Sequence, residues 1–252
     1  MASLRQVVDL LQSTLKPQLF NDYCPNGLQV QGKEQIQRLV TGVTASQALI
    51  DAAINLKADA ILVHHGYFWK GENACVVGMK KNRLKALLMN DISLLAYHLP
   101  LDAHHELGNN VQLAKKLGLG IAEPLYPENP KQVGNIAVLD EPMSAEDFSL
   151  LCERVLGQKP IDIAGANQLI KTIGFCTGAA QGFIEQAVVM GCDAYLSGEI
   201  SEPTVHTARE TGIHYFAAGH HATERYGVQA VGEFLAEKLG IEHIFVDIAN
   251  PV

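Results

Sequence analysis

The stretch LVTGVTASQALIDAAINLKADAILVHH, residues 39 to 65, decides the architecture of the chain. It begins and ends in short apolar runs, Leu39–Val43 and Ala60–His64, of the kind found in strands that are buried on both faces of a parallel sheet. Between them, Ser46–Leu56 carries apolar residues at helical spacing, and Thr44 with Gln47 predicts a capping box at its start. Strand, helix and strand in this order predict a parallel βαβ unit.

The same alternation of apolar runs and helical periodicity continues to the end of the chain. Further strands are predicted at Ser93–His98, Asn135–Leu139, Thr172–Cys176, Ala194–Ser197, Tyr215–Ala218 and His243–Val246. Further helices are predicted at Asn82–Met89, Val111–Leu117, Ala145–Leu156, Phe183–Met190, Glu202–Thr211 and Thr223–Leu239. The N-terminal MASLRQVVDLL is predicted to be an amphipathic helix and not a signal peptide. Together these elements predict an α/β fold with largely parallel sheets.

Parts of the chain repeat. With Asp59 aligned on Asp193 (193 − 59 = 134), the matches include Ala60 with Ala194. One strand later, AYHLPLD at 96–102 aligns with AGHHATE at 218–224, which pairs His98 with His220 and Asp102 with Glu224. The repeat predicts two similar α/β lobes, 1–127 and 128–252, joined within the proline-containing segment PLYPENPKQVG at 124–134. The plainer alternative is that any two βαβ units resemble one another.

Composition excludes several classes of protein. The 252 residues are 48% hydrophobic and 18% charged, which is ordinary for a globular protein. No apolar run reaches the roughly 18 residues of a membrane span. Five scattered cysteines without a CxxC pair favour a reducing cytoplasm over disulfides or a zinc–thiolate site. A formal net charge of −8 with only 19 Lys and Arg argues against an unaided nucleic-acid binder.

Histidines and carboxylates lie at or just after the ends of three of the predicted strands: His64, His65, His98, Asp102, His220 and Glu224. Ligands of open parallel sheets gather outside the carboxyl ends of the strands. Histidine with carboxylate suits Zn²⁺, Mn²⁺ or Fe²⁺ and provides enough donors for two ions, which a carboxylate such as Glu224 can bridge. Singly, each residue has a plainer explanation as a turn, core or helix-start residue. Their recurrence in step with the repeat favours a metal site.

Three further features leave alternatives open. Glu199 is either a proton carrier or partner of the same site, or a charge at the start of a helix. The loop CTGAAQG at 176–182 either holds an anion or is a tight turn, and it lacks a P-loop lysine. Tyr67, Phe68 and Trp69 either stack on a planar ring or pack in the interior.

Six motifs identify a family: PNGLQV at 25–30, GVTAS at 42–46, VHHGYFWKG at 63–71, YHLPLDAH at 97–104, CTG at 176–178 and GHHATERYG at 219–227. Over essentially its whole length the chain resembles the GTP cyclohydrolase type-2 homologues, also called Nif-three-like proteins, in their compact bacterial form. The resemblance implies a two-lobed fold, a toroidal homohexamer and a dinuclear metal centre in a cleft. It assigns the metal ligands to His64, His65, Asp102, His220 and Glu224.

These expectations lead to a hypothesis of a metal-dependent hydrolase that acts on a nucleotide or related purine through a metal-activated water. His98 or Glu199 would transfer protons. The alternative is a non-catalytic metal-binding ring or partner-binding scaffold, which needs the same ligands but no reactive water. A third possibility, nucleic-acid processing inside the ring, requires a basic lumen. The sequence leaves the identity of the ions and of the small-molecule substrate open.

Overall fold

The computed structural model describes residues 1–129, 133–166 and 168–252, and the chain divides into two compact units. Unit 1 comprises Met1–Leu107 with Gly227–Ala249, and unit 2 comprises Gly108–Tyr226 with Asn250–Val252. These bounds differ from the predicted lobes 1–127 and 128–252. The reason is strand pairing: residues 120–124 pair within the second sheet, and residues 242–245 return to the first. Of the predicted linker 124–134, residues 130–132 lie outside the described residues.

A five-stranded sheet in the order β13-β4-β5-β6-β2 forms the centre of unit 1. Its strands are β2 (Gly27–Val30), β4 (Arg38–Thr44), β5 (Ala60–His65), β6 (Ser93–Ala96) and β13 (Glu242–Phe245). All pairs are parallel except that of the edge strand β2 with β6. Two very short strands, β1 (Ala2–Ser3) and β3 (Gln35–Ile36), pair separately.

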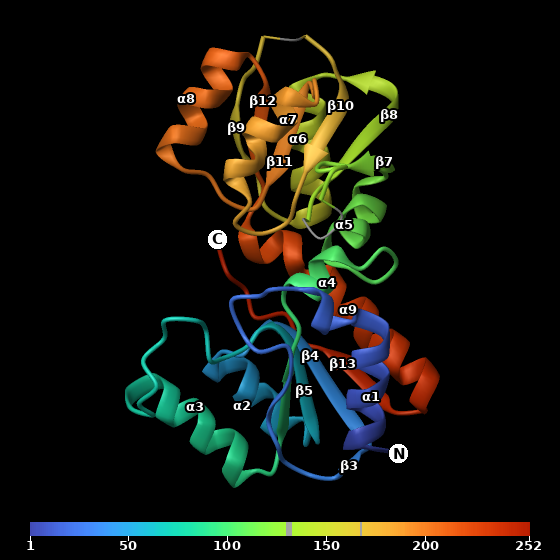
Figure 1. Ribbon diagram of the computed structural model, residues 1–252, viewed down its shortest axis with the longest axis vertical. Helices are drawn as coiled ribbons and strands as arrows, with labels where there is room; N and C mark the ends of the chain where they lie inside the picture. The colour runs from blue at the N-terminus through green and yellow to red at the C-terminus, as the bar shows by residue number, and fades with distance from the viewer. Residues whose placement is uncertain (130–132, 167) are drawn as a thin grey trace. The chain divides into compact units, whose positions relative to one another are not determined.

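Helices cover both faces of this sheet (Figure 1). One face packs against α1 (Leu4–Leu15) and against the part of α9 (His220–Leu239) that belongs to unit 1. The other face packs against α2 (Gln47–Asn55) and α3 (Gly78–Met89). The short helices η1 (Pro17–Leu19) and α4 (Leu99–Ala103) complete the unit. Unit 1 is therefore a three-layer α/β unit, as the unalternating apolar strands predict.

Unit 2 is built on a six-stranded sheet in the order β7-β8-β10-β11-β12-β9. Its strands are β7 (Gly120–Pro124), β8 (Asn135–Met143), β9 (Ile161–Ile163), β10 (Ile170–Phe175), β11 (Ala194–Ser197) and β12 (His214–Ala217). The central strands β10, β11 and β12 are parallel. Helices α5 (Asn109–Leu117) and α6 (Ala145–Leu156) pack on one face. On the other lie η2 (Gln181–Phe183), α7 (Ile184–Val189) and α8 (Glu202–Thr211).

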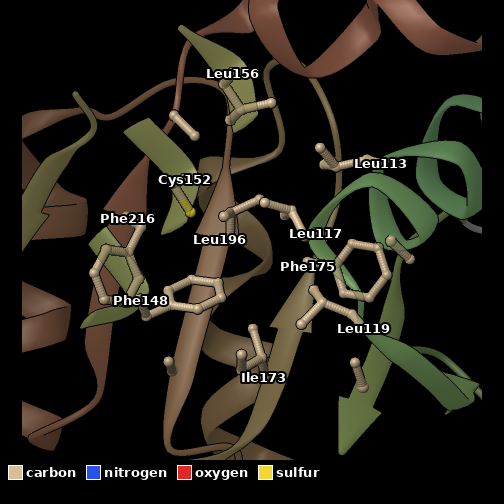
Figure 2. Packing of buried hydrophobic residues seen from close by; sticks show 14 of the residues in the cluster. Leu113, Leu117, Leu119, Phe148, Cys152, Leu156, Ile173, Phe175, Leu196 and Phe216 are labelled. Carbon is tan, nitrogen blue, oxygen red and sulfur yellow. The ribbon is translucent and has the colours of Figure 1, made fainter. Parts of the chain in front are cut away.

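Figure 2 shows the packing of one face of the second sheet. Phe148 and Cys152 of α6 lie against Leu196 and Phe216 of the sheet, and all four side chains are fully buried. The rings of Phe148 and Phe216 meet edge to face, with centroids 4.9 Å apart. Such contacts hold α6 on the sheet by apolar burial, which contributes about 25 cal/mol per Å² of buried apolar surface.

The structure corrects the capping box that was predicted at the start of α2. The N-cap is Ser46, whose side-chain oxygen accepts a hydrogen bond from the Leu49 N–H. Thr44 instead ends strand β4, and the Gln47 side chain bonds Asp51. The predicted capping box of Thr44 and Gln47 is therefore wrong, because the strand continues to the first of its two residues.

The internal repeat is visible in the register of the sheets. Strands β4 and β5 pair Leu39 with Ala60, and β10 and β11 pair Ile173 with Ala194, an offset of 134 (173 − 39). The carboxylates at the matched positions make matched bonds: Asp59 accepts from the N–H groups of residues 37 and 38, and Asp193 from those of residues 171 and 172. These shared details support a duplicated half over a chance likeness of βαβ units.

In the second part of the repeat, the offset between the matched segments differs by one residue from the prediction. Ala60 pairs with Ser93, whereas Ala194 pairs with His214, so the structural offset is 121 (214 − 93) and not the predicted 122. His98, the N-cap of α4, therefore corresponds to Gly219, the residue before α9. The predicted match of His98 with His220 is wrong, and the two histidines occupy neighbouring positions in the repeat.

The Asp59→Asn substitution is expected to lower the free energy of unfolding by about 1–3 kcal/mol at pH 7, because the carboxylate accepts from two backbone N–H groups and from Lys33. Burial opposes its ionisation, but these hydrogen bonds keep the pKa of Asp59 below its usual range. A lowered pKa in the folded state contributes stability above the unfolded pKa, which is lost as pH falls through the folded pKa. Urea unfolding should therefore show wild type and variant converging below about pH 4. The exposed Asp9→Asn change is the control, and a difference independent of pH would contradict the assignment.

The longest helix, α9, has 20 residues and carries charged groups along its length. Among the described residues, no helix combines the length and the apolar character needed to cross a bilayer.

Candidate metal centre

Three imidazole rings of unit 1 lie together at the carboxyl ends of β5 and β6. The ring centroids of His64 and His65 are 4.5 Å apart, those of His64 and His98 are 5.0 Å apart, and those of His65 and His98 are 5.8 Å apart. The chain turns away at Gly66, where a Cβ atom would lie 2.5 Å from that of Ala96. Each histidine offers a ring nitrogen within 4.8 Å of the others, so the three could hold a metal ion.

Hydrogen bonds fix the orientation of these rings. The Nδ1–H of His64 donates to the Tyr97 carbonyl at 2.9 Å, and that of His98 donates to Asp22 at 2.7 Å. A carbonyl or carboxylate can only accept, so in the neutral form of either ring the lone pair is on Nε2. The Nδ1 atom of His65 lies 3.2 Å from the Thr44 hydroxyl. Histidines that bind metals typically donate their second N–H to a carbonyl or carboxylate in this way.

Asp102 supplies a carboxylate to this group. Its Oδ1 atom lies 3.4 Å from Nε2 of His64, and both side chains are almost completely buried. A charge-assisted hydrogen bond is about 2.7–2.9 Å long. Two atoms that each bind one ion at about 2.0–2.2 Å lie about 3.0–3.6 Å apart, so this spacing fits two ligands of one ion. Asp102 belongs to the short helix α4, which the sequence did not predict.

Unit 2 has a second histidine–carboxylate pair at the start of α9. Nε2 of His220 lies 3.1 Å from Oε2 of Glu224, one helical turn later, and its Nδ1–H donates to Glu199 at 2.7 Å. Glu199 follows β11, its carbonyl accepts from the Tyr215 hydroxyl, and α8 starts only at residue 202. The structure therefore favours a partner of the histidine over a helix-start charge. Burial opposes the charge of His220, but Glu224 and Glu199 raise its pKa to about 9, so their negative field favours cations.

The CTGAAQG loop uses several of its backbone N–H groups within the protein, which favours a tight turn over an anion site. The N–H of Thr177 donates to the Asn110 side chain, that of Gly178 to the Thr223 hydroxyl, and that of Ala180 to Ser197. Gly178 has a positive φ of 68°, and a Cβ atom there would lie 2.0 Å from Oε1 of Glu224. Only glycine leaves room for that carboxylate, and this role was not predicted from the sequence.

The three aromatic residues that follow the histidines have different surroundings. Tyr67 packs in the interior and donates its hydroxyl to the Ala45 carbonyl. Trp69 meets His98 edge to face, with centroids 5.0 Å apart. Phe68 is 38% exposed, and the Lys80 ammonium lies over its ring. Of the two alternatives, packing describes Tyr67, while Trp69 borders the histidine cluster.

Asp22 and Cys24 lie near His98 and were not predicted from the sequence as site residues. Burial opposes ionisation of Asp22, but hydrogen bonds from His98 and Asn26 keep its pKa lowered. Cys24, Asp22 and His98 each offer a donor atom within 4.8 Å of the others, so these three residues could also hold a metal ion. Burial, and then the charge of Asp22, raise the pKa of the Cys24 thiol to about 12. None of the five cysteines, all within the described ranges, forms a disulfide.

The Glu199→Gln substitution is expected to weaken Zn²⁺ binding by roughly 10–100-fold, because it removes the carboxylate that orients His220 and increases its basicity. Competition with a chromophoric chelator would measure the change. Glu202→Gln is the matched control, since Glu202 also bonds a histidine, His206, but on an exposed helix surface. Equal effects of the two substitutions would exclude a specific role for Glu199.

Comparisons with known proteins cover the whole chain. A family model described as Duf34/NIF3 (NGG1p interacting factor 3) matches residues 2–251. A curated relative from Pseudomonas aeruginosa, "GTP cyclohydrolase 1 type 2 homolog", is 57% identical over 249 residues, with 99% of this chain and 98% of the relative covered. The protein of the same description from Escherichia coli K12 is 49% identical over 250 residues, with 98% of each covered. A solved structure described as "protein ybgI, unknown function" is 47% identical, with a TM-score of 0.96 and full coverage of both chains.

Proposed function

Because the chain belongs to the Duf34/NIF3 family, we propose that it is a metal-dependent hydrolase of the GTP cyclohydrolase type-2 kind. Two divalent ions would be held by His64, His65, Asp102, His220 and Glu224. The observation that carries the proposal is the spacing of His64 with Asp102 and of His220 with Glu224, 3.4 and 3.1 Å, which suits pairs of ligands. Nitrogen and carboxylate donors without thiolates fit Zn²⁺, Mn²⁺ or Fe²⁺.

The bound ions would supply Lewis acidity and lower the pKa of water. The substrate proposed is a nucleotide or related purine compound whose C–N bond is opened by hydrolysis. His98, with its Nδ1–H held by Asp22, would accept a proton from the attacking water at Nε2 and return it to the leaving nitrogen. Glu199 would keep Nε2 of His220 directed at its ion, with proton transfer as its second role. Trp69 would shield one side of His98 from water.

Turnover of GTP and related nucleotides by protein loaded with Zn²⁺, Mn²⁺ or Fe²⁺ tests the proposal. Product is expected with at least one metal, and Glu224→Ala should reduce the rate by about 100-fold or more, since it removes a ligand. His206→Ala, on an exposed helix surface, should leave the rate unchanged. No product from any nucleotide with any of the three metals would contradict the hydrolase proposal.

A non-catalytic metal-holding protein is the second candidate, because the same ligand spacing supports ion storage as well as catalysis. It predicts ions retained at stoichiometric occupancy without product, so the same samples separate the two candidates. The homohexameric ring implied by the resemblance is part of both proposals, and light scattering of the purified protein is expected to give six chains.

A further inference from the structure

The histidine cluster at the ends of β5 and β6 contains one more imidazole, that of His98, than the proposed centre uses as ligands. In a tetrahedral site with zinc–nitrogen bonds of about 2.0–2.1 Å, the centroids of the ligating rings lie about 5 Å apart. The separations among His64, His65 and His98 are 4.5, 5.0 and 5.8 Å. All three rings therefore have the mutual spacing of ligands to one ion, although His98 comes from a different strand end.

The surroundings of His98 resemble those of a metal ligand. Its partner Asp22 has only 3% of its side chain exposed and accepts further hydrogen bonds from Asn26 and from the Leu99 N–H. This carboxylate is rigidly placed, and it orients the ring so that in neutral His98 the lone pair is on Nε2. A carboxylate–histidine pair of this kind both orients a ligand and increases its basicity.

We propose that His64, His65 and His98 bind one divalent ion within unit 1, as a loading site that takes up the first ion before the two-ion centre is complete. The inference deepens the proposed metal centre and rests on it. Imidazole donors suit Zn²⁺, Co²⁺ and Fe²⁺ and disfavour Mg²⁺ and Ca²⁺, so the site selects transition metals at uptake. Once the two-ion centre is complete, Nε2 of His98 is released for proton transfer.

The test starts from the double variant His220→Ala with Glu224→Ala, which removes both donors of unit 2. Titration with Zn²⁺ or Co²⁺ is expected to give one ion per chain. In this background, His98→Gln should weaken binding by about 100-fold or more, and Asp22→Asn by roughly 10–100-fold. His105→Gln is the control, because that side chain is 84% exposed and its change should leave binding unaltered. Absence of ion binding by the double variant, or unaltered binding after His98→Gln, would overturn the inference.

A measurement on the wild-type chain avoids any variant that fails to fold. X-ray absorption of protein loaded with half an equivalent of Co²⁺ counts the imidazoles around the first ion. Three are expected, and two or fewer would overturn the loading site. Neither readout depends on turnover, so a protein that binds its first ion in this way but hydrolyses no nucleotide would retain the loading site and lose the hydrolase function.

Discussion

Replacing Gly178 with alanine is expected to weaken the binding of divalent ions by about 100-fold, the upper end of the effects seen when groups that orient metal ligands are changed. The new Cβ atom would lie 2.0 Å from Oε1 of Glu224 and 3.2 Å from Nε2 of His220. The turn cannot easily give way, because the N–H of Gly178 bonds Thr223 and its carbonyl accepts from Ser197. The carboxylate must therefore move away from the position that fits an ion.

Gly157→Ala is the matched control for this prediction. Gly157 also has a positive φ, 78°, but a Cβ atom there meets nothing within 4 Å. Both substitutions carry the cost of a left-handed alanine, about 1–2 kcal/mol, and only the first disturbs Glu224. Chelator competition measures affinity and thermal unfolding measures stability. If Gly178→Ala binds Zn²⁺ as tightly as Gly157→Ala, Glu224 is not a ligand in the position described.

The Phe148→Ala substitution is expected to reduce the free energy of unfolding by about 3–5 kcal/mol. Phe148 is fully buried between α6 and the second sheet, and its ring packs edge to face against that of Phe216 (Figure 2). Truncation removes this contact and leaves a cavity in a close-packed interior, which the neighbouring side chains fill only partly.

Leu150→Ala is the control for this prediction. It also places an alanine in α6, but at an exposed position, so it tests helix propensity without the loss of burial. Leu150 is 54% exposed, so its truncation should change the free energy of unfolding by no more than about 0.5 kcal/mol. Urea denaturation of the three proteins gives the comparison. Similar losses for both substitutions would show that the core described for unit 2 does not carry its stability.

Much of the fold is predictable because the central strands are buried on both faces. The βαβ unit of residues 39–65 appears in its predicted order, with strands β4 and β5 paired in parallel. The edge strands β2, β7 and β9 were missed, since three to five residues with few apolar side chains give no periodic signal. Their conformation comes from pairing with a neighbouring strand, which is a tertiary effect.

The candidate site could also be predicted only in part from the sequence. His64, His65 and His98 could be predicted to lie together because the parallel strands β5 and β6 deliver their carboxyl ends to one edge of the first sheet. Asp22 was missed because its partner His98 lies 76 residues away and no local pattern links them. The one-residue displacement of the repeat was missed for a related reason, since only strand register reveals that His98 corresponds to Gly219.

Metal analysis of protein purified without chelators shows whether the chain holds a pair of ions. Two divalent transition-metal ions per chain are expected, and fewer than two after His64→Ala, Asp102→Ala or Glu224→Ala, each confirmed as folded by circular dichroism. Protein that contains no such ions and takes up none on incubation with Zn²⁺, Mn²⁺ or Fe²⁺ would contradict this expectation, as would an ion content that all three substitutions leave unchanged.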